Sequence, residues 1–504
     1  MDLWTFQRYQ HPRLFVDAVD HEKGRAIVSL RSGPQIYRLA FDDDDAAAQT
    51  AEDLKTLRDS SAPLWRALHD SPCDSSWHDL ANFLDTRSLI GEARDGAANQ
   101  LAGQTERILA CIDGTRAAVL EGLSAERRAI VASHANVLRQ RLSRPAPLGL
   151  SFAPRENPFD AATQPNFFLA LLSVELEYFR RLSPLTLAAT DLLLGSMVDE
   201  AAGADTTGTS QTLSDTAGLY DERDLASHLW LVGTCLVSSS GDGAARLPTA
   251  PIPDLRLTSG MEFMRQTEML SRATLIGWGE NPYVAAINKL GGAFTPLVAG
   301  PFIEQYHVTR RFVEIIAPLL SMRLAAPLRS MMFRYYSEEY GHEALESTTC
   351  EALGVAEETL GKVLPLALHF AFVDTLTLLA DVDPITSFAA VMVIEGIFGE
   401  PPKMSLRLVA AAGNNADFRK VASDHDGLNE TLNHNSISRN LFEQITAVSP
   451  ARQADTMLRI LFLLELNHRA WDDITKFYGP QDQLWLQGAF GTRLAPKGLR
   501  GKVV

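Results

Sequence analysis

The chain has 504 residues, of which 46% are hydrophobic, and it carries a formal net charge of −16. This length exceeds one ordinary hydrophobic core and predicts two or three domains. The negative charge and the lack of a basic cluster in the sequence argue against a nucleic-acid partner and against an anionic membrane, because both favour concentrated Lys and Arg.

The cysteines and the amino-terminal sequence indicate the cellular compartment in which we expect the protein. Residues 1–15 are polar and mixed in charge, and the apolar stretches are interrupted by charge or proline before they reach the length of a membrane span. We therefore expect a soluble, cytoplasmic protein without a membrane partner. The four cysteines are far apart and form no Cys-x-x-Cys, so neither a disulfide framework nor a zinc knuckle is indicated: Cys73, Cys111, Cys235 and Cys350.

Residues 1–60 differ in pattern from the rest of the chain. Two short stretches rich in Ile, Val, Leu and Tyr, at 25–31 and 35–41, flank a turn around Gly33 and predict a β-hairpin. The acidic run 42–45 leads into a helix, whose dipole favours negative charge at its amino terminus. We expect a small hairpin-plus-helix module in which the acidic run is a solvated cap rather than a cation site.

Residues 61–250 are predicted to form a helical accessory region, with an amphipathic helical segment at 166–194. Two stretches rich in Gly, Ser, Thr, Ala or Pro, near 199–218 and 238–253, are typical of loops or linkers. We place the main domain boundary near residue 250. A helical bundle is expected to follow over residues 255–490.

A Glu-x-x-His pattern stands in this second half. A helix is predicted to begin after Pro327 and to carry Glu339 and His342 beyond an aromatic stripe. Three residues apart on a helix, the two side chains share one face and can bind a common ion. Two surface residues are the alternative interpretation, because the same pattern recurs at 465–468.

Glu395 is the only charged residue in the apolar stretch 388–398. A helix that is apolar all round should be buried, and a buried carboxylate has to be protonated, ion-paired or bound to a cation. A metal ligand is one answer. The other is an ion pair with an arginine such as Arg329 or Arg334.

A fourth segment, residues 424–442, is dense in ligand-type side chains. Asp426, Glu430 and His434 lie four residues apart on one helical stripe, whereas His425 and Asn429 lie on an adjacent stripe. The first register is our preferred interpretation. An ordinary polar helix face is the alternative.

In this order and spacing, residues 295–480 resemble the heme-oxygenase-like diiron oxidases and oxygenases. Many members of that family show His-x-x-x-Asp-x-x-His on the last ligand helix, whereas here Asn429 follows His425. The resemblance implies a mainly α protein with a heme-oxygenase-like bundle, and two iron ions that react with dioxygen. The ligands that it implies are Glu339, His342, Glu395, Asp426, Glu430 and His434, with His425 as a further candidate.

The resemblance also implies a small-molecule substrate that is oxidised in specialised metabolism. An amino-acid-like or amine substrate and N-oxygenation are our first expectation, with desaturation or oxidative carbon–carbon cleavage as alternatives. An external electron donor and a homodimer are compatible with it. Candidate substrate residues are Arg310, Tyr335 and Arg439, since an arginine can bind a carboxylate through two hydrogen bonds; Tyr306 and His307 lie nearby in sequence.

Other functions remain as alternatives. A cofactorless oxidase could use the same bundle with His and Tyr as acid and base, and a non-catalytic binding protein could use it as a scaffold. The sequence contains no Gly-x-Gly-x-x-Gly after a strand, no phosphate-binding P-loop and no Gly-x-Ser-x-Gly elbow. Nucleotide-binding and serine-hydrolase functions are therefore not supported.

Overall fold

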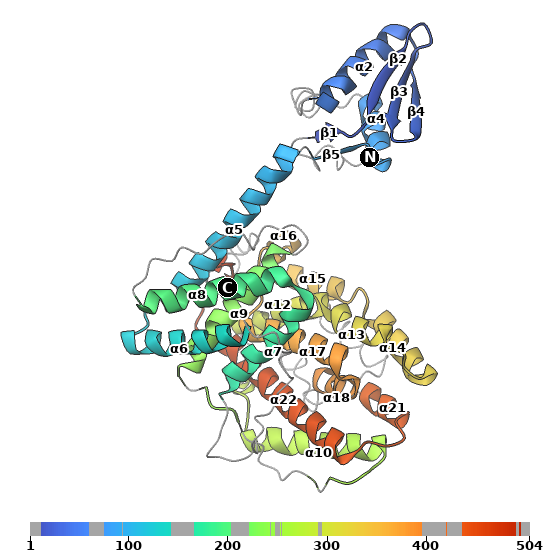
Figure 1. Ribbon diagram of the computed structural model, residues 1–504. Coiled ribbons are helices and arrows are strands. Elements are labelled where there is room, and N and C mark those ends of the chain that lie inside the picture. Colours follow the sequence, from blue (N-terminus) through green and yellow to red (C-terminus); the bar gives the residue numbers. More distant parts are fainter. Residues whose placement is uncertain are drawn as a thin grey trace. The chain divides into compact units, whose positions relative to one another are not determined.

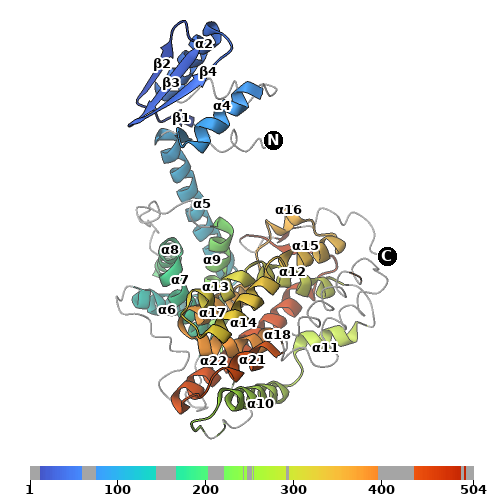
Figure 2. The ribbon, with the colours of Figure 1, turned by 90° about the vertical axis from the view of Figure 1, so that its right-hand side faces the viewer.

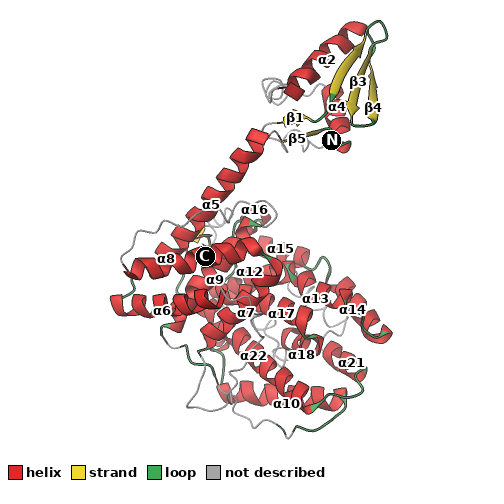
Figure 3. Cartoon of the chain, viewed as in Figure 1, coloured by secondary structure: helices red, strands yellow, loops and turns green. Residues whose placement is uncertain are grey.

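The computed structural model describes residues 12–59, 75–92, 94–142, 166–202, 221–241, 243–246, 253, 255–290, 295–395, 420, 436–489 and 493–494. These residues are mainly helical, with a small β part near the amino terminus (Figures 1 and 3). The expected mainly α class with an amino-terminal hairpin is therefore confirmed. The chain divides into two compact units, Met1–Arg107 (unit 1) and Ile108–Val504 (unit 2).

Unit 1 contains an antiparallel sheet of β2 (Ala18–Glu22), β3 (Ile27–Ser32) and β4 (Gln35–Ala40), in that order. The expected hairpin is the β3–β4 pair, and its turn contains Gly33 at φ +57°, which glycine adopts without strain. Strand β2 is an addition that the sequence pattern did not indicate. A separate short pair joins β1 (Pro12–Leu14) to β5 (Ile90–Glu92).

Helix α2 (Asp44–Asp59) follows the hairpin as expected and buries Ala47, Ala51 and Leu54 in the core of unit 1. The Asp44 carboxylate accepts hydrogen bonds from the backbone N–H groups of Gly24 (2.9 Å) and Ala26 (3.1 Å). The acidic run therefore fixes the turn between β2 and β3 as well as starting the helix. Helix α4 (Ser75–Thr86) and the first part of α5 (Arg94–Leu120) also belong to this unit.

Unit 2 is helical throughout most of its described length (Figure 2). Before residue 250 it contains α6 (Ala125–Leu142), α7 (Phe167–Leu182), α8 (Pro184–Ala202) and α9 (Glu222–Ser239). After residue 255 it contains α10 (Gly260–Trp278), α11 (Pro282–Lys289), α12 (Pro296–Arg310), α13 (Phe312–Ser321), α14 (Ala326–Glu339), α15 (Glu343–Ala352), α16 (Glu357–Leu360), α17 (Ala367–Val382), α18 (Pro384–Glu395), α21 (Ile437–Glu443) and α22 (Pro450–Tyr478). Two short strands, β6 (Leu486–Gln487) and β7 (Arg493–Leu494), pair near the end.

Helix α17 forms the centre of unit 2. Every residue from 370 to 380 is buried, and the helix packs against α7, α9, α13, α18 and α22. A helix that is covered on all sides needs apolar residues on all sides, and this stretch has them except at Asp374, Thr375 and Thr377. The partners of the polar side chains of α17 therefore come from the helices that pack around it.

The helices on either side of residue 250 share one hydrophobic core. Residues of α7 and α9, such as Leu171 and Leu229, belong to the same buried cluster as residues of α17 and α22, such as Leu376 and Leu463. The division between compact units lies after Arg107, so it does not coincide with the boundary expected near residue 250. No helix in the described ranges is long and apolar enough to cross a membrane.

Candidate functional site

The Glu-x-x-His pattern at 339–342 spans a break between two helices. Glu339 is the last residue of α14, and His342 is the N-cap residue of α15. Between them, Gly341 adopts φ +92°, which side-chain-bearing residues rarely adopt. The expectation that both residues lie on one continuous helix was therefore wrong, because the glycine turns the chain at this point.

The two side chains nevertheless meet. His342 Nδ1 lies 2.9 Å from Glu339 Oε2, and the two residues are only 7% and 5% exposed. In the tautomer that donates from Nδ1 to Glu339, Nε2 is the ring nitrogen whose lone pair a metal ion would bind. A carboxylate that holds a histidine in this way fixes the ring orientation and raises its basicity as a ligand.

Glu395 ends α18 and is joined to α14 through Tyr335. The buried Tyr335 hydroxyl donates to Glu395 Oε1 at 2.8 Å. Burial, then the negative charges of Glu395 and Glu339, raise the pKa of Tyr335 well above its ordinary value, so the phenol keeps its proton. Tyr335 thus lies within electrostatic reach of both candidate iron-binding carboxylates.

The burial expected of the helix around Glu395 is confirmed for residues 386–393. Glu395 itself is half-buried at the helix end. Of the arginines considered as its ion-pair partner, Arg334 bonds to Glu338 at 2.6 Å, and Arg329 is exposed. Among the described residues, Glu395 accepts a hydrogen bond from the Tyr335 hydroxyl.

The remaining candidate ligands lie outside the described residues, and their roles stay predictions: His425, Asp426, Glu430 and His434. Within the described part of the chain, no three His, Cys, Asp or Glu side chains lie close enough to bind one metal ion. The contacting carboxylate and imidazole of Glu339 and His342 fit the oxygen and nitrogen donors that non-heme iron prefers. The described donors therefore fit part of an iron site.

The candidate substrate residues have separate surroundings. Arg310 lies 3.5 Å from Asp224 and 3.7 Å from Asp221. Arg439 has a side chain that is 53% exposed and binds Glu268 through two hydrogen bonds of 2.8 and 2.7 Å. A substrate at Arg439 would have to displace that bidentate ion pair, whereas the longer contacts of Arg310 are weaker.

Two further Glu-x-x-His patterns lie on continuous helices of unit 2. In α22, Glu465 accepts hydrogen bonds from the backbone N–H of Arg246 and from Arg469, and His468 contacts the Arg246 guanidinium at 3.0 Å. The expectation that this copy consists of surface residues was wrong, because Glu465 and His468 are both buried and fix residues 243–246 against α22. The spacing alone does not identify a metal site.

The third pattern, Glu304 and His307 in α12, was missed although its spacing was visible in the sequence. Glu304 is fully buried and accepts hydrogen bonds from the Leu366 N–H (2.8 Å) and the Tyr478 hydroxyl (3.0 Å). Burial raises its pKa to about 8. Glu304 therefore joins α12 to the start of α17 and the end of α22 as a neutral carboxyl at mildly acidic pH.

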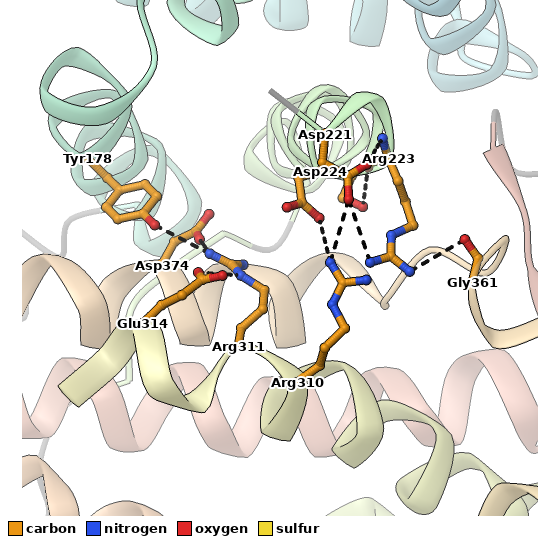
Figure 4. A network of polar contacts seen from close by, with 10 residues as sticks. Tyr178, Asp221, Arg223, Asp224, Arg310, Arg311, Glu314, Gly361 and Asp374 are labelled. Carbon is orange, nitrogen blue, oxygen red and sulfur yellow. Dashed lines mark hydrogen bonds and ion pairs between the residues drawn. The ribbon is translucent and has the colours of Figure 1, made fainter. Parts of the chain in front are cut away.

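A buried charge network around Arg311 was also missed. The guanidinium donates to Asp374 (2.6 Å), Glu314 (2.9 Å) and the Tyr178 hydroxyl (3.3 Å), as Figure 4 shows. Burial, then the charge of Asp374, raise the pKa of Glu175, which favours its protonated form. This network joins α7, α13 and α17 in the middle of unit 2.

Comparisons with known proteins gave one structural neighbour. No protein-family model matches the chain, and no curated protein matches it. The neighbour is a crystal structure of a domain of unknown function with a heme oxygenase-like fold from Shewanella denitrificans OS217. It is 16% identical, with a TM-score of 0.36, and the match covers 44% of this chain and 93% of that chain.

Proposed function

We propose that this chain is a non-heme diiron oxygenase or oxidase that uses dioxygen to oxidise a small molecule. The observation that carries the proposal is the contact between the buried side chains of Glu339 and His342, beside the hydrogen bond from Tyr335 to Glu395. A mixed imidazole and carboxylate set suits non-heme iron, which when bound supplies the reduction and activation of dioxygen.

The side chains have distinct roles in this proposal. Glu339 and His342 are proposed ligands of one iron. Glu395 and residues 425–434 would supply further ligands to the two-iron centre, the latter through Asp426, Glu430 and His434, with His425 as a further donor. Tyr335 orients Glu395 and stays protonated, because burial and then the negative charges of Glu395 and Glu339 raise the pKa of its phenol. The buried apolar residues of α18 keep water from the substrate.

The substrate proposed first is an amino-acid-like or amine metabolite, and the reaction proposed first is N-oxygenation. Desaturation and oxidative carbon–carbon cleavage by the same iron centre are the next candidates. Electrons for more than one turnover would come from an external donor. Incubation with amines and isotopically labelled dioxygen, followed by mass spectrometry, separates oxygen insertion from desaturation, because only insertion adds the label to the product.

Iron content tests the proposal directly. The protein is loaded with ferrous ion without air, its iron is measured per chain, and dioxygen consumption is followed on mixing. Wild type is expected to hold about two irons, while Glu395→Ala and His342→Gln lose iron and dioxygen consumption together. His468→Gln is the matched control, because His468 belongs to the Glu-x-x-His pair that contacts Arg246 and is expected to retain iron.

Other outcomes favour the alternatives. Dioxygen consumption by iron-free wild type would support a cofactorless oxidase of the same bundle. A wild-type chain that neither binds iron nor consumes dioxygen would support a non-catalytic binding protein. If His468→Gln lost as much iron as His342→Gln, the iron loss would reflect a damaged fold and not a missing ligand. The unfolding curve of Glu395→Ala would then be compared with that of wild type.

A further inference from the structure

Three helix ends of unit 2 surround a small hollow. The first turn of α9, the last turn of α12 and the first turn of α17 contribute most of its lining. Three guanidinium groups, two imidazoles and one carboxylate belong to the residues that line it. The polar lining residues are Arg223, Asp224, His307, Arg310, Arg311 and His369.

Several hydrogen-bonding nitrogens at this hollow are buried and make no hydrogen bond to any described residue. They are Nε2 of His307, Nδ1 of His369 and Nη1 of Arg311. The residues His307 and Arg311 are only 5% and 7% exposed. Burying a polar group without a hydrogen-bond partner is costly, so three such nitrogens around one hollow point to a ligand with acceptor atoms.

The contacts of the two outer arginines are long. Arg223 lies 3.9 Å from Asp221 and 3.5 Å from the carbonyl oxygen of Gly361, and Arg310 lies 3.5–3.7 Å from Asp224 and Asp221 (Figure 4). Contacts of this length are weak compared with the 2.7–2.9 Å of a good charge-assisted hydrogen bond. Both guanidinium groups can therefore turn toward a ligand at little cost.

The start of α17 adds to the preference for negative charge. Its N-cap residue, Leu366, provides no side-chain cap, and His369 lies in the first turn, where the positive end of the helix dipole is found. Burial raises the pKa of Asp224, the one carboxyl in the lining, to about 6, so its negative charge weakens in mildly acidic solution. A metal cation would meet three guanidinium groups and only this one carboxylate.

We propose that this hollow is a binding site for a small oxyanion, a carboxylate or phosphate group, held by Arg223, Arg310, His307 and His369. When the anion binds, Arg223 and Arg310 give up their long contacts to Asp221 and Asp224 and bind the anion instead. The buried Nη1 of Arg311 supplies a further donor. None of these residues is a proposed iron ligand. The site therefore binds its anion in the iron-free chain, and its test is independent of the proposed diiron activity.

Calorimetry on the iron-free full-length chain tests this site. Inorganic phosphate and succinate are titrated separately at about pH 6, which tells a phosphate-type ligand from a carboxylate-type ligand. Saturable one-to-one binding is expected for at least one of them, and Arg310→Gln and His369→Gln are each expected to weaken it about tenfold through loss of a charged or buried hydrogen bond.

The control is Arg265→Gln on α10, because Arg265 has an exposed side chain that pairs with Glu262 outside the hollow. This variant should bind the anion like wild type. Histidine resonances in an NMR titration provide a second readout. The anion should shift two histidine signals, of which one is missing in His307→Gln and the other is missing in His369→Gln. Lack of binding of both probes up to roughly 10 mM, or wild-type affinity in folded Arg310→Gln and His369→Gln, would overturn the proposal.

Discussion

Replacing Arg311 with methionine tests how much the buried charge network stabilises unit 2. Methionine retains much of the apolar stem but removes the donors to Asp374, Glu314 and Tyr178. Asp374 is fully buried, so its carboxylate would lose its guanidinium partner inside the core. Removing one partner of a buried ion pair costs about 3–5 kcal/mol, and we expect the free energy of unfolding to fall by that amount.

Two further variants set the scale for that value. Tyr178→Phe removes one hydrogen bond to the same guanidinium and should cost only about 1 kcal/mol. Arg265→Met removes an arginine whose side chain is 65% exposed and whose pairing with Glu262 is screened by solvent, so it should leave the unfolding midpoint unchanged. The expected order of destabilisation is Arg311→Met, then Tyr178→Phe, then Arg265→Met.

Urea unfolding combined with hydrogen exchange of α17 peptides measures these effects. Because the chain has two compact units, a single two-state curve does not describe it, and exchange of residues 367–382 reports the unit that contains Arg311. Arg311→Met should speed exchange along α17, and Arg265→Met should not. Equal unfolding midpoints for the two variants would refute the view that Arg311 balances a charge in the core.

Three other predictions follow from single contacts. Burial raises the pKa of Glu304 to about 8, above about 4.3 in an unfolded chain, so the folded state keeps a proton that the unfolded state loses, and the free energy of unfolding should fall by about 1.4 kcal/mol per pH unit from about pH 4.5 to 8. In Glu304→Gln this part of the pH dependence of the urea midpoint should vanish. An unchanged pH dependence in that variant would contradict the assignment. In Gly260→Ala the new Cβ would lie 2.3 Å from the Phe442 carbonyl oxygen, so calorimetric melting should show a loss of about 1–3 kcal/mol, whereas Gly103→Ala, whose Cβ meets only the end of Arg107 at 3.7 Å, should show none. Tyr335→Phe removes the hydrogen bond to Glu395 and should weaken ferrous-ion binding about 10–100-fold; unchanged iron affinity in a competition titration with a chelator would separate Tyr335 from the proposed site.

Local patterns in the sequence predicted much of the fold. The stretches 25–31 and 35–41 around Gly33 predicted the hairpin, which the structure has as the β3–β4 pair. The apolar stretch around Glu395 predicted a buried helix, and its burial is confirmed for residues 386–393. Strand β2 was missed because its charged residues, in the sequence AVDHE, give little apolar alternation. Pairing with β3, which is a contact between separate segments, decides its conformation.

Predicting the candidate site required contacts that no local pattern contains. Asp374 has the same signature as Glu395, a lone carboxylate in an apolar helix, yet its partner is the buried Arg311. Glu395 meets a tyrosine sixty residues earlier in the chain. Identical signatures therefore lead to different chemistry, because the packing of separate helices supplies the partner.

The glycine between Glu339 and His342 affects how relatives of this site can be recognised. A sequence search that requires an uninterrupted helical pattern across residues 339–342 would reject this chain, although its two side chains touch at 2.9 Å. Replacement of Gly341 by alanine, a residue that generally favours helix, would instead strain the backbone at φ +92°. A search pattern or a protein-engineering scheme for this arrangement should therefore keep a glycine before the histidine and allow the helix to end at the glutamate.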